Sequence, residues 1–243
     1  MIAIKTNNLC KSYKNCDAVN NLNLEIQDGE LYSLLGVNGA GKTTTIKMLS
    51  CLTQPTQGSA TIYGFDLIKD SQNIKQIINV SPQETAVAPM LSVKENLEFI
   101  CEIYGFSQNK AQQKTLELME VLQLSQIANQ RAGTLSGGWQ RRLSIAMALI
   151  SEPKILFLDE PTLGLDVIAR RELWEFIKKL KQKMTIILTT HYLEEAENLS
   201  DHIGIMNQGQ IMISGSLDEL LKQANTDNFE DAFIQFSHQE AVL

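Results

Sequence analysis

The feature that most restricts the fold of this 243-residue chain is a segment near its N-terminus that fits the pattern G-x-x-x-x-G-K-[ST]. It lies between an apolar run at 31–35, typical of a short strand, and a segment at 44–52 with the apolar spacing of a helix. A strand, a glycine-rich loop and a helix in this order predict a phosphate-binding loop, called the phosphate loop below. It consists of Gly36, Val37, Asn38, Gly39, Ala40, Gly41, Lys42 and Thr43, and is followed by Thr44.

Each residue type in the phosphate loop suits an anion. Glycines allow the backbone to curl so that several amides face one phosphate group, and the helix that begins near Lys42 adds the positive end of its dipole. Lys42 supplies a full charge to the terminal phosphates of a nucleotide, and the Thr43 hydroxyl can ligate a magnesium ion. The alternative is a glycine-rich turn that arose by chance, but the flanking strand and helix favour nucleotide binding.

Composition narrows the class of protein further. With 44% hydrophobic and 20% charged residues, the chain is long enough for one large domain or two small ones. Its net charge of −7 argues against nucleic acid as a main partner. The apolar runs are far shorter than the ~20 residues of a membrane-spanning helix, and the first five residues do not resemble a signal peptide, so we expect a cytoplasmic protein. We expect reduced thiols at Cys10, Cys16, Cys51 and Cys101.

Hydrophobic periodicity divides the chain into regions of strand and helix. Alternation predicts strands at 2–9 and 18–26, at the edge of an antiparallel sheet, with a turn at 27–30. The middle of the chain favours helices, which are predicted at 93–104, 110–122 and 138–150. Strand-like runs then return, with strands predicted at 155–158, 185–189 and 203–206, a helix at 168–181 and a hairpin at 206–214.

These regions together predict an α/β fold with a parallel sheet at its core. An N-terminal antiparallel β subdomain precedes the core, and an α-helical subdomain at about 85–150 is inserted into it. The sequence shows neither an internal repeat nor a low-complexity linker. We therefore predict one domain over 2–225 and a short helical tail over 226–243.

An acidic pair forms a second candidate element of the site. The apolar run at 155–158 ends in Asp159 and Glu160, and parallel sheets place ligands at the carboxyl ends of their strands. Because successive strand residues point to opposite sides, we expect different tasks for the two acids. Asp159 would hold magnesium and Glu160 would polarise the attacking water. A solvated turn is the alternative, which the phosphate loop upstream disfavours.

The segment Leu135-Ser136-Gly137-Gly138-Trp139-Gln140, called the signature segment below, closely resembles the LSGGQ signature of the ABC ATPases. Ser136 and the amides of the two glycines open the predicted helix at 138–150 and make a second helix N-terminus suited to phosphate. The resemblance implies a head-to-tail dimer, in which this segment caps the nucleotide held by the phosphate loop of the other subunit. An isolated helix cap is the alternative for Ser136, and Trp139 departs from the commonest family residue.

Four further positions match family motifs in order. Gln83, after the strand-like run at 77–80, resembles the Q-loop glutamine that reaches the metal and the attacking water. His191 resembles the switch histidine that bonds the γ-phosphate and holds Glu160. Asp166 resembles the D-loop residue that communicates across the dimer, and Tyr13 the aromatic that stacks on adenine. Without the family, a surface glutamine, a structural histidine and a tyrosine on the sheet are the simpler interpretations.

The resemblance covers residues 4–221 and implies the ABC ATPase fold, a P-loop NTPase core, in a subunit that binds ATP with Mg²⁺ and hydrolyses it. The stretch 135–165 and the tail 228–233 look like ATPases of the ABC-2 type, which mostly serve exporters of drugs, peptides, lipids or polysaccharides. Implied partners are a second copy or close homologue and separate multi-spanning permease subunits at the cytoplasmic face of the membrane. The segment 91–106 is the surface expected to receive the permease.

Some alternatives stay open at this point. An ABC ATPase acting on ribosomes or in DNA repair is the main rival, although paired cassettes or long coiled-coil insertions are not visible in the sequence. A P-loop kinase or GTPase would not explain 135–138, and the guanine-reading Asn-Lys-x-Asp motif is absent. The transported substrate, the direction of transport and the choice between homodimer and heterodimer are not determined.

Overall fold

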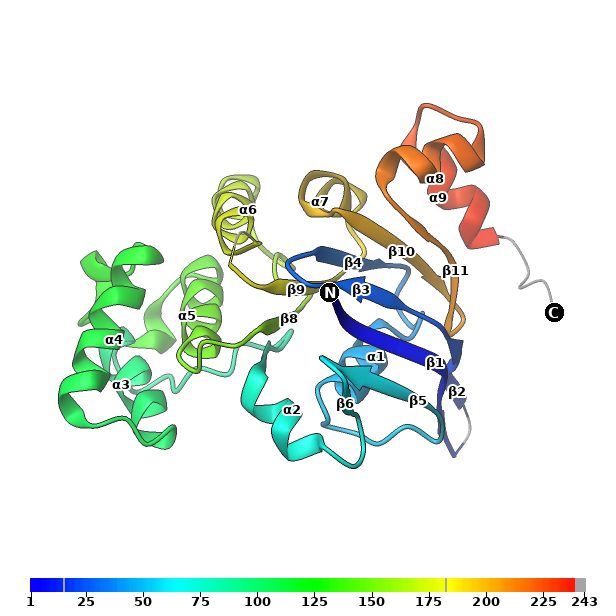
Figure 1. The fold of residues 1–243 in the computed structure, drawn as a ribbon. Coiled ribbons are helices and arrows are strands. Elements are labelled where there is room, and N and C mark those ends of the chain that lie inside the picture. The colour runs from blue at the N-terminus through cyan, green and yellow to red at the C-terminus, as the bar shows by residue number, and fades with distance from the viewer. Residues whose placement is uncertain (15, 182, 239–243) are drawn as a thin grey trace.

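The fold is built around a six-stranded sheet in a computed structural model that describes residues 1–14, 16–181 and 183–238 (Figure 1). In spatial order its strands are β11 (Gln210–Gly215), β10 (His202–Asn207), β4 (Leu31–Leu35), β9 (Thr185–Thr190), β8 (Ile155–Asp159) and β7 (Ile78–Ser81). All neighbours are parallel except the hairpin β10–β11. The predicted parallel core and its terminal hairpin are therefore confirmed.

The central strands are buried on both faces, and β8 shows why an apolar run can become such a strand. Ile155 and Phe157 belong to one hydrophobic cluster, whereas Leu156 and Leu158 belong to another on the opposite face. Side chains of a strand alternate between faces, so a continuous apolar run serves two cores. Asp159 is the next residue on the face of Phe157, which is the face covered by the first helix.

A smaller antiparallel sheet lies across that face. Its strands are β2 (Cys16–Leu22), β1 (Ile2–Tyr13), β5 (Gln57–Ile62) and β6 (Phe65–Asp66), with β3 (Glu25–Gln27) also paired to β1. The prediction of one strand over 18–26 is wrong, because the run is divided between β2 and β3. Asn21 adopts a left-handed backbone (φ +50°), and the Leu24 amide donates to the Thr6 side-chain hydroxyl of β1 rather than to a backbone carbonyl.

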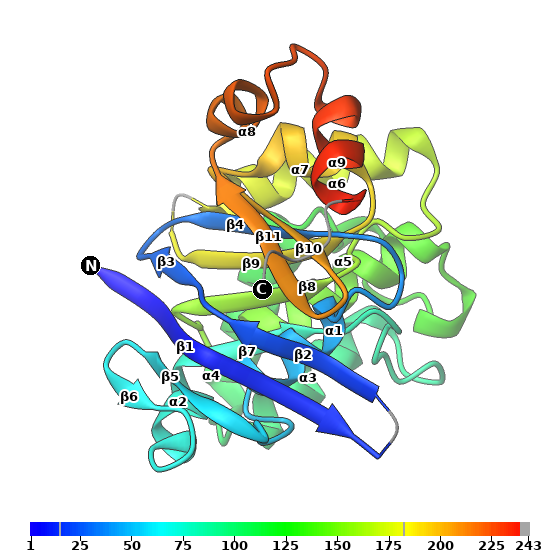
Figure 2. The same ribbon diagram turned by 90° about the vertical axis from the view of Figure 1, so that its right-hand side faces the viewer.

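Nine α-helices occur within the described ranges: α1 (Lys42–Leu49), α2 (Ser71–Ile77), α3 (Val93–Ile103), α4 (Gln108–Val121), α5 (Gly137–Leu149), α6 (Val167–Lys181), α7 (Leu193–Leu199), α8 (Leu217–Ala224) and α9 (Phe229–His238). Figures 1 and 2 show α1 between the two sheets and α3, α4 and α5 grouped beyond the β7–β8 edge. None of these helices has both the length and the apolarity that a bilayer crossing requires. The predicted tail at 226–243 contains α9, and its last five residues lie outside the described part.

The C-terminal helices pack onto the core. Phe229 and Phe236 of α9 are buried in a cluster with Ile203 and Ile205 of β10 and with Leu220 of α8. Helix α8 begins with a capping box, in which the Ser216 hydroxyl accepts from the Glu219 amide and the Glu219 carboxylate accepts from the Ser216 amide. Helix α9 therefore packs against the core.

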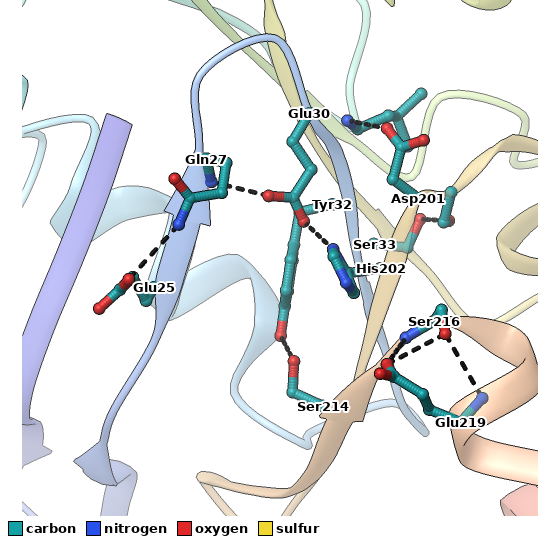
Figure 3. Close-up of polar contacts among 12 residues, drawn as sticks. Glu25, Gln27, Glu30, Tyr32, Ser33, Asp201, His202, Ser214, Ser216 and Glu219 are labelled. Carbon is teal, nitrogen blue, oxygen red and sulfur yellow. Dashed lines mark hydrogen bonds and ion pairs between the residues drawn. The ribbon is translucent and has the colours of Figure 1, made fainter. Parts of the chain in front are cut away.

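A polar cluster ties β4 to the hairpin at the end of the sheet where β4 begins (Figure 3). The Glu30 carboxylate accepts from the Gln27 amide at 2.7 Å and lies 2.6 Å from Nδ1 of His202. The buried Tyr32 hydroxyl lies 2.7 Å from that of Ser214, and burial raises the pKa of Tyr32 far above its ordinary value. A Cβ on Gly204 would lie 2.2 Å from the Tyr32 hydroxyl oxygen, so the tyrosine requires glycine there. We interpret this cluster as structural.

Candidate active site

The phosphate loop connects β4 to α1, as predicted, and its glycines are required by close approaches. Gly41 has a left-handed backbone (φ +106°), and a Cβ there would lie 2.4 Å from the Ala18 carbonyl oxygen. A Cβ on Gly36 would lie 2.3 Å from the Met206 carbonyl oxygen. The Gly209 amide, in the β10–β11 turn, donates to the Ala40 carbonyl at 2.9 Å. The loop is thus held between β2 and the hairpin.

The N-terminus of α1 leaves its first amides available. Gly41 is the N-cap residue, and within the described residues no side chain caps this helix. The Lys42 ammonium donates to the carbonyl oxygens of Gly36 at 2.7 Å and Val37 at 3.2 Å, so the loop curls around its own lysine. Free amides, the dipole of α1 and this ammonium all favour an anion at one place.

Asp159 ends β8 beside the start of α1. Its Oδ1 accepts from the Thr43 hydroxyl at 3.2 Å and from the Thr189 hydroxyl at 2.5 Å. Thr189 lies opposite Asp159 in the register of β8 and β9, and its hydroxyl also accepts from the Glu160 amide at 3.0 Å. One threonine therefore orders both acidic residues.

Glu160 lies beyond the end of β8 in a left-handed conformation (φ +49°). Its Oε1 is 3.3 Å from Nζ of Lys42, and its Oε2 is 2.7 Å from Nδ1 of His191. Both acids therefore lie at one site, as their position at the end of a parallel strand predicts, and the left-handed turn brings the Glu160 carboxylate there. The side chains of Lys42 and Glu160 are each only 6% exposed, so this ion pair is poorly screened by solvent.

A cavity of about 500 Å³ collects most of the predicted residues. Gln83 and Tyr13 lie on its wall, although Tyr13 is 49% exposed and the Lys11 ammonium lies over its ring at 5.2 Å. The predicted residues that line the cavity are Tyr13, Asn38, Gly39, Ala40, Gly41, Lys42, Thr43, Thr44, Gln83, Glu160 and His191. Gly36 and Val37 contact Lys42, and Asp159 contacts Thr43, directly behind this lining.

Four predicted residues lie elsewhere in the chain. Ser136 is the N-cap of α5, but its hydroxyl makes no capping bond to the described part of the helix, and Gly137 and Gly138 form the first turn. The Asp166 carboxylate accepts from the amides of Ile168 and Ala169, both at 2.9 Å, and so caps α6. None of these four residues lines the cavity.

The residues near α1 fit a magnesium ion in their chemistry. Thr43 and Asp159 offer a hydroxyl and a carboxylate oxygen 3.2 Å apart, and Gln83 offers an amide oxygen on the same cavity. Among the described residues no group of three or more His, Cys, Asp and Glu side chains is placed to hold a metal by itself. Magnesium is commonly bound by one or two carboxylates together with substrate phosphates, and this donor set matches that case.

The sequence did not single out three residues that surround the site. Thr189 orders the two acids, Arg141 of α5 is 4% exposed, and Glu195 of α7 is 0% exposed. Burial raises the pKa of Glu195, and its Oε1 accepts from the Trp174 indole at 3.1 Å. Neither Arg141 nor Glu195 carried a clear signal in the sequence, because Arg141 has the polar neighbours Gln140 and Ser144 and Glu195 follows another glutamate.

Comparisons with known proteins agree with this geometry. The model of the family described as ABC transporter matches residues 19–163. The linearmycin resistance ATP-binding protein LnrL of Bacillus subtilis is 37% identical over 225 residues, which are 92% of this chain and 72% of that protein. Human phospholipid-transporting ATPase ABCA3 is 40% identical over 217 residues, which are 88% of this chain but only 13% of that protein.

A solved structure matches in three dimensions as well. It is the dimeric ATP-binding cassette MJ0796 in a post-hydrolysis state bound to ADP and Pi, and it matches with a TM-score of 0.79 and 29% identity. The match covers 88% of this chain and 98% of that one. The predicted fold, with its parallel sheet, antiparallel subdomain and added helices, is therefore confirmed.

Proposed function

Because this chain belongs to the ABC transporter family, as an ATP-binding cassette that hydrolyses ATP, we propose that it powers a membrane exporter through separate membrane-spanning permease subunits. The observation that carries the proposal is the set of contacts joining Lys42, Glu160 and His191 on the wall of one cavity. A phosphate-binding helix end, a carboxylate and a ring that holds the carboxylate are the parts that hydrolysis of a phosphoanhydride requires.

In the proposed reaction, the triphosphate lies on the amides of the phosphate loop with the Lys42 ammonium beside it. A carboxylate oxygen of Glu160 accepts a proton from water, whose oxygen then forms a bond to the γ-phosphorus. The bond from that phosphorus to the bridging oxygen breaks, and its electron pair leaves with ADP. His191 holds Glu160 through the 2.7 Å contact and extends toward the γ-phosphate.

Magnesium is proposed to be held by Thr43, Asp159 and Gln83. When bound, the ion would neutralise part of the charge that develops on the phosphate oxygens. Asp159 is held ready by the hydroxyls of Thr43 and Thr189, so its carboxylate needs little reorganisation. Tyr13, at the open end of the cavity, is proposed to stack on the adenine ring.

The signature segment is proposed to act on a second subunit. Ser136, Gly137 and Gly138 do not line the cavity of their own chain and would contact nucleotide held by a partner cassette. Asp166 lies beside this surface at the start of α6 and would communicate between the two sites. The solved cassette is dimeric, which supports an assembly of two copies or of two close homologues.

The cassette is proposed to drive an ABC-2 type exporter and to lie at the cytoplasmic face of the membrane. LnrL is named for linearmycin resistance and ABCA3 for transport of phospholipid, which favours drugs and lipids among the drugs, peptides, lipids and polysaccharides considered. The segment 91–106, which contains α3, is proposed to receive the permease. Phe99 and Ile103 are exposed on this helix, 48% and 63% respectively, and offer an apolar surface.

The test is co-purification of the Glu160→Gln protein from its own cells with Mg-ATP in gentle detergent, followed by mass spectrometry. A multi-spanning membrane protein that is recovered with nucleotide, and lost when Lys42→Ala is added, would support the proposal. Recovery of ribosomes or DNA-repair factors alone would contradict it. The recovered pair in liposomes should then hydrolyse ATP faster than the cassette alone.

A further inference from the structure

Arg141 is a buried cation that does not form an ion pair within the described residues. It lies one turn into α5 and is 4% exposed. Its guanidinium donates to two successive carbonyl oxygens, from Nη1 to Pro82 at 2.5 Å and from Nη2 to Gln83. Burial lowers the pKa of Arg141, while the carboxylates of Asp159 and Glu195 oppose that shift, and an arginine side chain stays charged in either case.

The same face of α5 also contacts the end of β7 and the loop that follows it. The hydroxyls of Ser144 and Ser81 lie 3.1 Å apart, and the Gln140 side-chain oxygen accepts from the Thr85 hydroxyl at 3.4 Å. Figure 1 shows the chain that follows α2 passing beside α5 on its way to α3. The helix that begins with the signature segment and the loop that carries Gln83 are therefore joined by side chains of one helix face.

The contact between Arg141 and Gln83 leaves the glutamine side chain free. Arg141 binds the backbone carbonyl of Gln83. Gln83 is an exposed residue and lies on the wall of the cavity. The loop here is neither helix nor strand, so regular backbone pairing does not determine where this residue stands. A planar guanidinium with several donors can hold two neighbouring carbonyls at once, which a lysine ammonium cannot do with the same geometry.

We propose that Arg141 is a positioning residue that sets the place of Gln83 in the cavity and so connects the signature helix of each subunit to hydrolysis in its own site. The inference rests on the proposed roles of Gln83 and the signature segment. A shift of α5 caused by a partner's nucleotide would move the Gln83 backbone with it. Arg141 itself does not touch the reacting atoms.

The test compares ATP hydrolysis by the purified wild type with Arg141→Met, Arg141→Lys, Gln83→Ala and the double variant Arg141→Met/Gln83→Ala. Misplacement of a group by about 1 Å can cost about a hundredfold in rate, so we expect Arg141→Met to lower kcat about ten- to a hundredfold. KM for ATP should stay within about twofold, because the nucleotide is held by the phosphate loop. The double variant should be no slower than Gln83→Ala alone, since both changes remove one function.

Arg142→Gln is the matched control. Arg142 is the next residue of α5 and is also buried, but its guanidinium pairs with Glu172 of α6 at 2.5 Å and stacks on Trp139. The variant Arg142→Gln should lower kcat only slightly. Because this change is independent of Gln83, its loss should multiply with the loss caused by Gln83→Ala. If Arg141→Met does not fold, Arg141→Lys serves the same test, with an expected loss of about fivefold for the lost second carbonyl contact.

Two outcomes would overturn the inference: an unchanged kcat in both Arg141 variants, or losses from Arg141 and Gln83 that simply multiply. Either result would mean that Arg141 only fills space in the core, and the proposed transport function would stand. Absence of ATP hydrolysis in the wild type would instead contradict the proposed function. The two failures are therefore distinguishable.

Discussion

The N-terminus of α1 and the N-terminus of α5 are alike in their capping but differ in the residues that surround them. Within the described residues both lack a side-chain cap, so both leave backbone amides available to an anion. The end of α1 lies in a cavity with Lys42, Glu160 and His191 gathered around it. The end of α5 has Ser136 and two glycines, and the Arg141 guanidinium behind it is committed to carbonyls of its own chain.

The difference shows how a phosphate site can be divided between two molecules. The chain builds the α1 site completely and places buried charges there, which are costly without partners. At α5 it builds only amides and a hydroxyl, which cost little when solvated. We therefore expect the first end to bind nucleotide alone, and the second to contribute only in the proposed dimer, where another subunit supplies the charges. The predictions below test this asymmetry, from the largest expected effect to the smallest.

The largest effect is expected for Glu160→Gln. A positioned general base is worth about 10²–10⁴-fold in rate, so kcat should fall by that factor while ATP still binds. The variant should accumulate as an ATP-bound dimer, measured by light scattering, because closure no longer ends in hydrolysis. Glu175→Gln on the exposed face of α6 is the control. Equal kcat in the wild type and Glu160→Gln would remove the carboxylate from its proposed task.

Next in size is the contrast between Lys42→Ala and Ser136→Ala. A hydrogen bond to a charged group is worth about 1.5–3 kcal/mol, so Lys42→Ala should raise the Kd of the single cassette for ATP about ten- to a hundredfold. Ser136→Ala should leave that Kd unchanged and weaken only ATP-dependent dimerisation. Calorimetric titration and light scattering measure the two quantities. Lys47→Ala, exposed on the same helix as Lys42, is the control.

Ser136→Ala should also leave stability nearly unchanged. Loss of a working N-cap costs about 0.5–2 kcal/mol, but the Ser136 hydroxyl does not cap the described residues of α5, so we expect less than about 0.5 kcal/mol. Urea unfolding measures the difference. A full capping loss would show that this serine serves its own helix, and the contrast between the two helix ends would then weaken.

A separate prediction, on the pH dependence of stability, concerns Glu195, which is buried behind the α1 site. In the unfolded chain its carboxyl ionises near the ordinary pKa of 4.5, whereas burial raises that pKa in the folded protein. Between those two values the folded state binds more protons, so wild-type stability falls as pH rises, by at most about 1.4 kcal/mol per pH unit. The variant Glu195→Gln keeps a side-chain oxygen that can accept from the Trp174 indole. It has no ionisable group at this position, so it should lack this dependence of stability on pH.

Urea unfolding at pH 5 and pH 8 measures that slope. Glu195→Gln should gain stability relative to the wild type at the higher pH, while the control Glu194→Gln, whose carboxylate is 48% exposed, should not. A stability difference between Glu195→Gln and the wild type that is the same at both pH values would mean that Glu195 is ionised in the folded protein.

Sequence reasoning predicted the elements that depend on local chemistry. The strand before the phosphate loop was predicted at its observed bounds, and the helices around the signature segment within a few residues. It missed β5, whose pairing partner β1 lies far away in the chain, and β6, which pairs with β5, and it joined β2 to β3. The break between them depends on Thr6, a residue of another strand. Tertiary contacts therefore overrode the local alternation.

The sequence by itself determined the phosphate loop, the acidic strand end and the signature segment, because glycine backbone freedom and hydrophobic periodicity act over a few residues. The tertiary structure decided which of these elements meet. Strand order brings Asp159 to Thr189, and the left-handed turn at Glu160 brings its carboxylate to Lys42 and His191. Such encounters depend on packing between distant segments, and periodicity within one segment carries no information about them.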